Sequence, residues 1–481
     1  MQFNQKPKYQ LIPSGEHIMF TAYDAKVLTK YKFKYVAYLY VSDQSSTWAS
    51  NKIGTLKASP NVKGVGIFDF SSIVDNYVSP DYEGGKVLIN SGSNYSKCDL
   101  QPFTTRYHDI HRVDKFSTAR NSIRWFKVMI FCEYAESITA PVLQFQDSAH
   151  AETSVDYLVY NGVLNESDIL IEDSADLGYN LDHHGLILND TVGKFLTNSP
   201  TLQYIRDYDY HTLAFFSNYD TDFVVGNAGA TNPGLNHINT QFYYNGATAG
   251  SLLQSQCLAG GGGYNASSDE SSTKMIFAGV GVGNLRGNGY TVPTNWDSYL
   301  VFATDDIGEQ ISQVYQFIKQ DIDADGNVDC KGYETIRLTW LNKFGAWDYY
   351  NFTKKSSRTF SKEGSTYEQQ SGTWNEDTFA IRGYKGGSRS FGSKVSETIT
   401  INTDWITEDE AVWMEELFIS SDVFIIDRSS TYNANQGDIR KFTSPVLVSS
   451  TEHARKTKTN DGLIQYTFEI KRSINRKTHR R

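Results

Sequence analysis

The stretch YETIRLTWLNKFGAWDYYNFTKK (residues 333–355) begins with Tyr333 and concentrates six further large aromatic side chains in an otherwise polar chain. They are Trp340, Phe344, Trp347, Tyr349, Tyr350 and Phe352. TIRLTWLN has the composition of a strand, NKFG (342–345) of a turn, and AWDYYNFTKK of a returning strand, which predicts a β-hairpin. Because side chains alternate along a strand, at least half of these aromatics are expected to face inward. An exposed aromatic platform for sugars is the alternative.

The rest of the chain shows the same period of two. YKFKYVAYLYVSD (31–43), KGVGIFDFSSIV (63–74) and SIRWFKVMIFCEY (122–134) alternate and are separated by Gly, Ser, Asn and Asp clusters. Such runs are typical of sandwiches and barrels. The sequence therefore predicts a mainly β protein with several β-sandwich or barrel-like domains.

Changes in composition suggest three domains. We expect an N-terminal β-rich domain at 1–150, an acidic, loop-rich β domain at 151–330, and a C-terminal β domain at 331–481. In the second domain, Asn161-Gly162 lies between apolar runs and predicts a hairpin. Residues 229–272 are so rich in Gly, Asn and Ser that we expect long loops there, at a surface that contacts a receptor or a subunit.

TEDEAVWMEELFIS predicts a short capped helix at 407–420 in the C-terminal domain. Thr407 and Glu410 have the spacing of a capping box. Trp413 and Leu417 are four residues apart and should lie on one face.

The charge is unevenly distributed along the chain. The net charge is −10, yet residues 151–330 hold 23 Asp and Glu against 5 Lys and Arg, and the remainder holds 32 against 40. An acidic block between mildly basic ones favours contact between copies or neighbours. A single solvated acidic domain is the alternative.

Cysteine usage and hydropathy indicate an intracellular site of synthesis. Cys98, Cys132, Cys257 and Cys330 form no CxxC pair, so we expect reduced, mostly buried thiols. The N-terminus has no apolar segment after its lysines, and no run approaches 18 apolar residues. We expect no membrane insertion.

No pattern with catalytic chemistry is evident, so we expect no enzyme, no catalytic residues and no cofactor. His108-Asp109-Ile110-His111 and Asp182-His183-His184 are dense in histidine but lack a third metal ligand that can be placed. DIDADGNVD (321–329) begins like a calcium loop, with Asp321, Asp323 and Asp325 followed by Gly326. Position twelve is Gly332 in place of Glu, so a structural calcium and a plain acidic turn both remain open.

The chain ends in a basic segment, KRSINRKTHRR. Arg476, Lys477, Arg480 and Arg481 are interface candidates for docking on an acidic neighbour, and a solvated tail is the alternative. With a net charge of −10 and no further basic face, we expect no nucleic-acid binding.

Two regions carry a resemblance to a known group of proteins. IPSGEHIMFTAYD, YVAYLYVSD and VGIFDFSSIVDNYVS near the N-terminus, and LNKFGAWDYYNFTKKSS, ITINTDWITEDEAVWMEELFISSDVFI and SPVLVSSTEHARKTKTNDGLIQYTFEI near the C-terminus, resemble tailed-bacteriophage virion proteins. These are tail or baseplate components of marine and Bacteroidota-infecting phages. The likeness covers about the first 80 and the last 150 residues.

The resemblance implies a non-enzymatic structural protein at the tail tip, baseplate or collar, located in the virion and assembled in the host bacterial cytoplasm. Its expected partners are copies of itself and other virion tail proteins. Trp340, Phe344, Trp347, Tyr349 and Tyr350 then become interface candidates, as buried anchors of a core-and-assembly hairpin. The rivals are a receptor- or carbohydrate-binding module of the tail and a tail-associated hydrolase.

Overall fold

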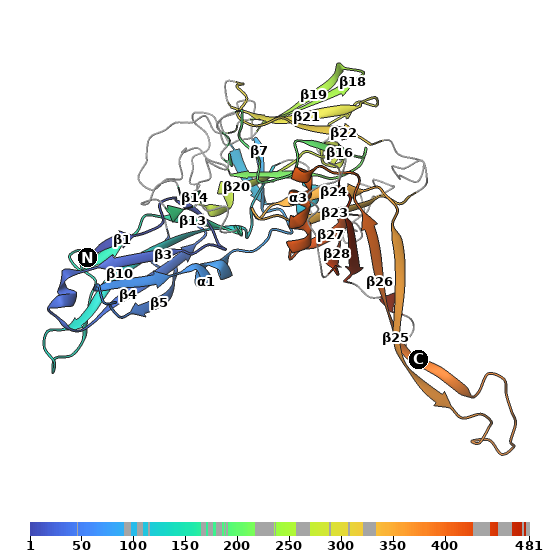
Figure 1. The fold of residues 1–481 in the computed structure, drawn as a ribbon, viewed down its shortest axis with the longest axis horizontal. Coiled ribbons are helices and arrows are strands. Elements are labelled where there is room, and N and C mark those ends of the chain that lie inside the picture. Colours follow the sequence, from blue (N-terminus) through green and yellow to red (C-terminus); the bar gives the residue numbers. More distant parts are fainter. Residues whose placement is uncertain are drawn as a thin grey trace. The chain divides into compact units, whose positions relative to one another are not determined.

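A computed structural model describes residues 1–481 except 46, 91–97, 103–108, 114–115, 165–169, 172–176, 179–184, 187, 189–190, 217–234, 236, 256–269, 288–289, 306–307, 321–332, 427–442, 451–463, 474–475 and 478–481. The chain forms two compact units. The first unit is Met1–Gln320 with Leu341–Asp348, and the second is Asp321–Trp340 with Tyr349–Arg481. Strands dominate both (Figure 1), which confirms the prediction of a mainly β protein.

The first unit begins with a sandwich of two sheets. One sheet has the order β1-β3-β6, and the other the order β2-β13-β10-β4-β5, with β11 and β12 also paired to β10. The strands are β1 (Gln2–Gln5), β2 (Leu11–Pro13), β3 (Met19–Tyr23), β4 (Tyr31–Ser42), β5 (Lys52–Ala58), β6 (Val65–Asp69), β10 (Ile123–Ala135), β11 (Leu143–Phe145), β12 (Ala151–Thr153) and β13 (Tyr157–Tyr160). Phe20 of β3 packs edge-on against Tyr157 of β13 at 5.6 Å between ring centroids, so aromatic rings join the two sheets.

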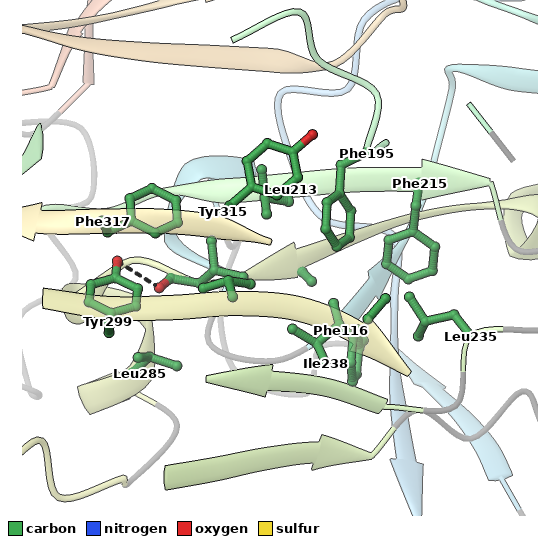
Figure 2. Close-up of a cluster of buried hydrophobic side chains, with 14 of the residues drawn as sticks. Phe116, Phe195, Leu213, Phe215, Leu235, Ile238, Leu285, Tyr299, Tyr315 and Phe317 are labelled. Carbon is green, nitrogen blue, oxygen red and sulfur yellow. Dashed lines mark hydrogen bonds between the residues drawn. The ribbon is translucent and has the colours of Figure 1, made fainter. Parts of the chain in front are cut away.

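A second sandwich follows in the same unit. Its sheets have the orders β17-β20-β9-β7-β8 and β16-β22-β21-β18-β19. The strands are β7 (Lys86–Asn90), β8 (Cys98–Pro102), β9 (Phe116–Thr118), β16 (Leu202–Ile205), β17 (Thr212–Phe216), β18 (His237–Tyr244), β19 (Ala247–Ser255), β20 (Met275–Gly279), β21 (Ser298–Thr304) and β22 (Tyr315–Lys319). Figure 2 shows its core, where Phe215 and Tyr299 come from opposite sheets and the Tyr299 hydroxyl donates to the Val280 carbonyl at 3.1 Å.

Strand pairing in the first unit crosses residue 150. β13 pairs with β10, and β20 pairs with β9, so residues on both sides of the expected domain boundary share each sheet. Two short strands, β14 (Leu170–Ile171) and β15 (Leu177–Gly178), pair with each other. The short helices α1 (Ser71–Val74) and α2 (Val282–Gly287) complete the unit.

The second unit is built on one antiparallel sheet with a helix packed on it. The sheet has the order β24-β23-β27-β28-β29-β26-β25, with β30 paired to β26. The elements are β23 (Ile336–Leu341), β24 (Trp347–Phe352), β25 (Ser357–Gln369), β26 (Gly387–Asn402), α3 (Glu408–Ile419), β27 (Val423–Ile426), β28 (Thr443–Val448), β29 (Thr467–Arg472) and β30 (Arg476–Lys477). The sheets that the structure describes are open, so the domains are sandwich-like and none is a closed barrel.

The predicted helix is confirmed as α3. Thr407 is its N-cap, and the capping box with Glu410 is complete in both directions. Trp413 and Leu417 are buried against the sheet, as their spacing predicts.

The predicted aromatic hairpin is confirmed as β23 and β24. Asn342 N donates to Ala346 O at 2.8 Å, and Gly345 has φ +74°, which closes the turn. Residues of β23 are buried on both faces, Arg337 and Thr339 included, so more of the hairpin is interior than simple alternation predicts. Arg337 is accommodated because it donates to Asn351 Oδ1 at 3.0 Å.

Two expectations for 151–330 are wrong. Asn161-Gly162 makes no hairpin turn: neither residue has positive φ, and β13 is already flanked by β10 and β2. Residues 229–272 are not loop throughout, because β18 and β19 form a hairpin there. Its turn is Asn245-Gly246, with φ of 49° and 76°, the conformation that a two-residue hairpin turn requires.

Candidate functional site

The tip of the aromatic hairpin is fastened inside the first unit. Asn342 Nδ2 donates to the Leu196 carbonyl at 2.8 Å and to Asp348 Oδ1 at 3.1 Å. Thr197 Oγ1 donates to the same Asp348 oxygen at 2.6 Å. Asn342 Oδ1 also accepts the amides of two residues in the turn, each at 3.0 Å. The turn is therefore held by side-chain bonds from both of its ends.

Trp347 extends this attachment to a buried carboxylate. Its Nε1 donates to the Asp81 carbonyl at 3.0 Å, and its ring lies 4.8 Å from that of His111. The Asp81 carboxylate accepts from Asn121 N at 2.6 Å and Ser122 Oγ at 2.7 Å. Burial raises the pKa of Asp81 above its ordinary range, although these donors oppose the rise.

These positions correct the assignment of the hairpin aromatics as interface residues. Trp340, Phe344, Trp347 and Tyr349 are each at most 3% exposed, because other parts of the chain already cover them. They offer almost no surface to a partner. Tyr350 is half-buried, and its hydroxyl accepts from Asp404 N at 3.1 Å.

Of the other predicted site residues, the structure describes only some. Asp321, Asp323 and Asp325 lie outside the described residues, as do Arg480, Arg481 and the Asp182–His184 stretch, so the calcium site stays a prediction. Arg476 and Lys477 form β30, whose backbone pairs with Lys394 and Val395 of β26. Within the described ranges, no cluster of three or more His, Cys, Asp or Glu could hold a metal ion.

The most exposed element of the second unit is a long ribbon, which sequence reasoning missed. We call residues 357–402 the arm; it comprises β25, β26 and the segment between them. Figure 1 shows it extending from its sheet. The first twelve of the thirteen residues of β25 are exposed. Thr359 pairs with Thr398, which is the last residue of β26 to pair with β29. The ten residues of β25 that follow Thr359 extend the ribbon by about 33 Å.

The end of the arm presents apolar side chains to solvent. We call residues 370–389 the arm tip. Trp374 is 67% exposed, Phe379 59%, Ile381 77% and Tyr384 64%. Several large apolar side chains that are exposed close together are typical of a surface that binds another molecule.

The arm tip is internally ordered despite its exposure. Thr373 is buried, and its hydroxyl donates to the Thr378 carbonyl at 2.8 Å and accepts from Ala380 N at 2.7 Å. The Trp374 and Phe379 rings lie 4.8 Å apart. A surface that is already shaped loses little conformational entropy on binding.

The arm tip carries an excess of positive charge. It holds three Lys and Arg against two Asp and Glu. Arg382 and Lys385 share one carboxylate, that of Glu376, at 2.7 and 3.4 Å. Arg389 donates to the Tyr384 carbonyl.

A separate polar pocket of about 660 Å³ lies in the first unit. Its walls come from the end of β4, the loop to Asn51, residues 118–124 and residues 270–272. Its two arginines are neutralised, Arg124 by Asp43 at 2.8 Å and Arg120 by Glu83 at 2.6 Å. Glu270 also lines the pocket and adds one carboxylate, and the exposed ring of Tyr77 gives the lining an aromatic face.

The helices that the structure describes include none that is long and apolar enough to span a membrane.

Comparisons with known proteins identify no family. No family model matches the chain, and no curated protein matches it. Among solved structures, the chain is similar to trypsin-activated alpha-2-macroglobulin from Escherichia coli at 7% identity and a TM-score of 0.17. That match covers 83% of this chain and 22% of the other, so the chain spans less than a quarter of its length. A likeness this low carries no argument about function.

Proposed function

We propose that the chain is a non-enzymatic structural component of a tailed-phage virion, at the tail tip, baseplate or collar. It would act by binding copies of itself and neighbouring virion proteins, after assembly in the host cytoplasm. The sequence resemblance supports the phage assignment. The arm is the observation that supports assembly.

Beyond Thr359 and Thr398 the arm has no core of its own, and this is what indicates a partner. β25 reads SRTFSKEGSTYEQ, with two large apolar side chains among its thirteen residues, and no residue of it is fully buried. A two-stranded ribbon is marginally stable in water without a covered face. An exposed edge strand is also a template for pairing with another chain, which natural proteins usually shorten or cover. Apart from the short pairing of β30 with Lys394 and Val395, the ribbon is uncovered, and with its apolar end it therefore fits an element that is covered in an assembly.

Mass spectrometry of purified particles of the encoding phage, with copy number per particle, tests the proposal. We expect the chain in several copies per particle. Shortening the arm, by replacing residues 365–391 with an Asn-Gly turn, should leave a folded chain that is no longer incorporated. Absence of the wild-type chain from particles would contradict the proposal.

The polar pocket favours a second candidate, a carbohydrate-binding module. Hydroxyl and amide groups of Thr47 and Asn51, two neutralised arginines and the Tyr77 ring suit a neutral polyhydroxylated ligand, whose apolar ring face can stack on tyrosine. Binding of the full chain to a glycan array, weakened by Tyr77→Ala and unchanged by Tyr204→Ala, would support it. Tyr204 is 55% exposed and does not line the pocket. Equal binding by both variants would contradict it.

A further inference from the structure

We propose that the arm tip of one copy docks on the outward face of α3 in a second copy of this chain. The inference rests on the proposed function and names the surface that the arm tip contacts. Both surfaces, the arm tip and the outward face of α3, belong to the second unit. Each exposes apolar side chains, and their net charges are opposite in sign.

The outward face of α3 has an apolar centre. Val412 is 47% exposed and Ile419 is 76% exposed. Seven residues are close to two turns of an α-helix, so the two side chains lie on one line along the helix. Trp413, Met414 and Leu417 fill the opposite side, which is buried against the sheet. The exposed pair is therefore not needed for packing within the chain.

Acidic residues border this apolar line on both sides. Glu408 and Glu415 lie on one flank, and Asp409 and Glu416 on the other, as follows from 100° per residue. Residues 404–422 contain seven Asp and Glu and no Lys or Arg. The arm tip also exposes apolar side chains, and its three Lys and Arg against two Asp and Glu give it a net charge of +1, opposite in sign to the helix. Apolar centres with complementary rims are what a specific interface needs.

The contact must be made between copies. The ribbon carries its tip about 33 Å past the last β29 partner of the sheet, whereas α3 packs on the sheet itself. Two copies that exchange tips reciprocally form a closed dimer, and a tip that docks on the next copy in one direction forms a heterologous, head-to-tail contact. Contacts of this kind close into rings or extend as filaments, depending on the rotation between copies.

Two variants that each lose one side of the contact test this. Ile381→Asp places a carboxylate on the arm tip, and Val412→Asp/Ile419→Asp places two on the helix face. All three positions are exposed, so the fold should persist, with an unchanged circular dichroism spectrum and melting temperature. Leu447→Asp, at a 57% exposed position of β28 outside both surfaces, is the matched control.

Sedimentation velocity of the full-length proteins gives the readout. The wild type and Leu447→Asp should self-associate, and each docking variant alone should be monomeric. A mixture of the two docking variants retains one intact tip and one intact helix, so it should stop at a 1:1 heterodimer. The proposal is overturned if the helix variant still self-associates like the wild type, if the mixture forms no heterodimer, or if the control also becomes monomeric. Failure of the proposed function is distinct, since it appears as absence of the wild-type chain from particles.

Discussion

Replacing Trp413 by alanine should lower the free energy of unfolding of the second unit by about 3–5 kcal/mol. The indole is 3% exposed and lies 5.1 Å from the Trp340 ring and 6.1 Å from the Tyr350 ring. Alanine would leave a cavity that the sheet cannot fill, because Trp340 is itself fully buried. Each lost aromatic pair adds about 0.5–1.5 kcal/mol to the transfer term, which places the change in the upper part of the range.

Two neighbouring substitutions separate packing from helix formation. Thr407→Ala removes the capping side chain and should cost about 1 kcal/mol. Val412→Ala, one position before Trp413, should change stability by less than about 0.5 kcal/mol, because Val412 faces solvent. A large effect at Trp413 with small effects at the other two positions identifies burial as the cause.

Urea unfolding followed by far-ultraviolet circular dichroism is the assay, with hydrogen exchange of 404–426 to assign the transition to the second unit. The two units can unfold separately, so a single transition should not be assumed. Equal, negligible effects of Trp413→Ala and Thr407→Ala would refute the packing of α3 on its sheet.

Three further outcomes are expected. Gly345→Ala should strongly destabilise the first unit in thermal unfolding, because φ is +74° and a Cβ would lie 1.9 Å from the Asn161 carbonyl oxygen; a wild-type melting temperature would show that the turn is not seated there. The hydrogen bond with Asp69 raises the pKa of His17, so the stabilising effect of His17 over His17→Gln should be fully present below the ordinary pKa of histidine and be lost as the pH rises through the raised pKa; a difference that is constant with pH would contradict it. Burial raises the pKa of the Cys132 thiol to about 11, so maleimide should modify it only after unfolding, and rapid labelling of Cys132 in the folded chain, located by peptide mapping, would contradict its burial.

The elements that the sequence predicts well are those with a local cause. The period of two in 31–43 and 122–134 becomes β4 and β10, because alternating side chains leave one face to bury. The capping box of α3 satisfies the first amides of the helix with side chains only three residues apart.

The two Asn-Gly dipeptides show that a local sequence signal alone does not predict a hairpin turn. Asn245-Gly246 turns back because β18 has an edge on which β19 pairs. Asn161-Gly162 does not, since β10 and the parallel strand β2 already occupy both edges of β13. The same two residues therefore have different outcomes, and for Asn161-Gly162 one of the deciding strands, β2, is more than a hundred residues away in the chain.

The arm was missed for a related reason. Between Thr359 and Thr398 its strands lack an apolar face, so the period that predicts half-buried strands is absent there; Ile399 and Ile401, at the base of β26, are buried in the sheet core. The apolar side chains of the arm tip lie in a Gly-rich segment, where sequence patterns predict a loop. In the structure the same segment is an ordered, exposed and weakly basic surface at the end of a ribbon with no core. Trp340 and Trp347 are buried, whereas Trp374, Phe379 and Tyr384 of the arm tip are each more than half exposed and lie close together in the chain. This contrast is why we propose that the assembly contact lies on the arm and not on the aromatic hairpin of β23 and β24.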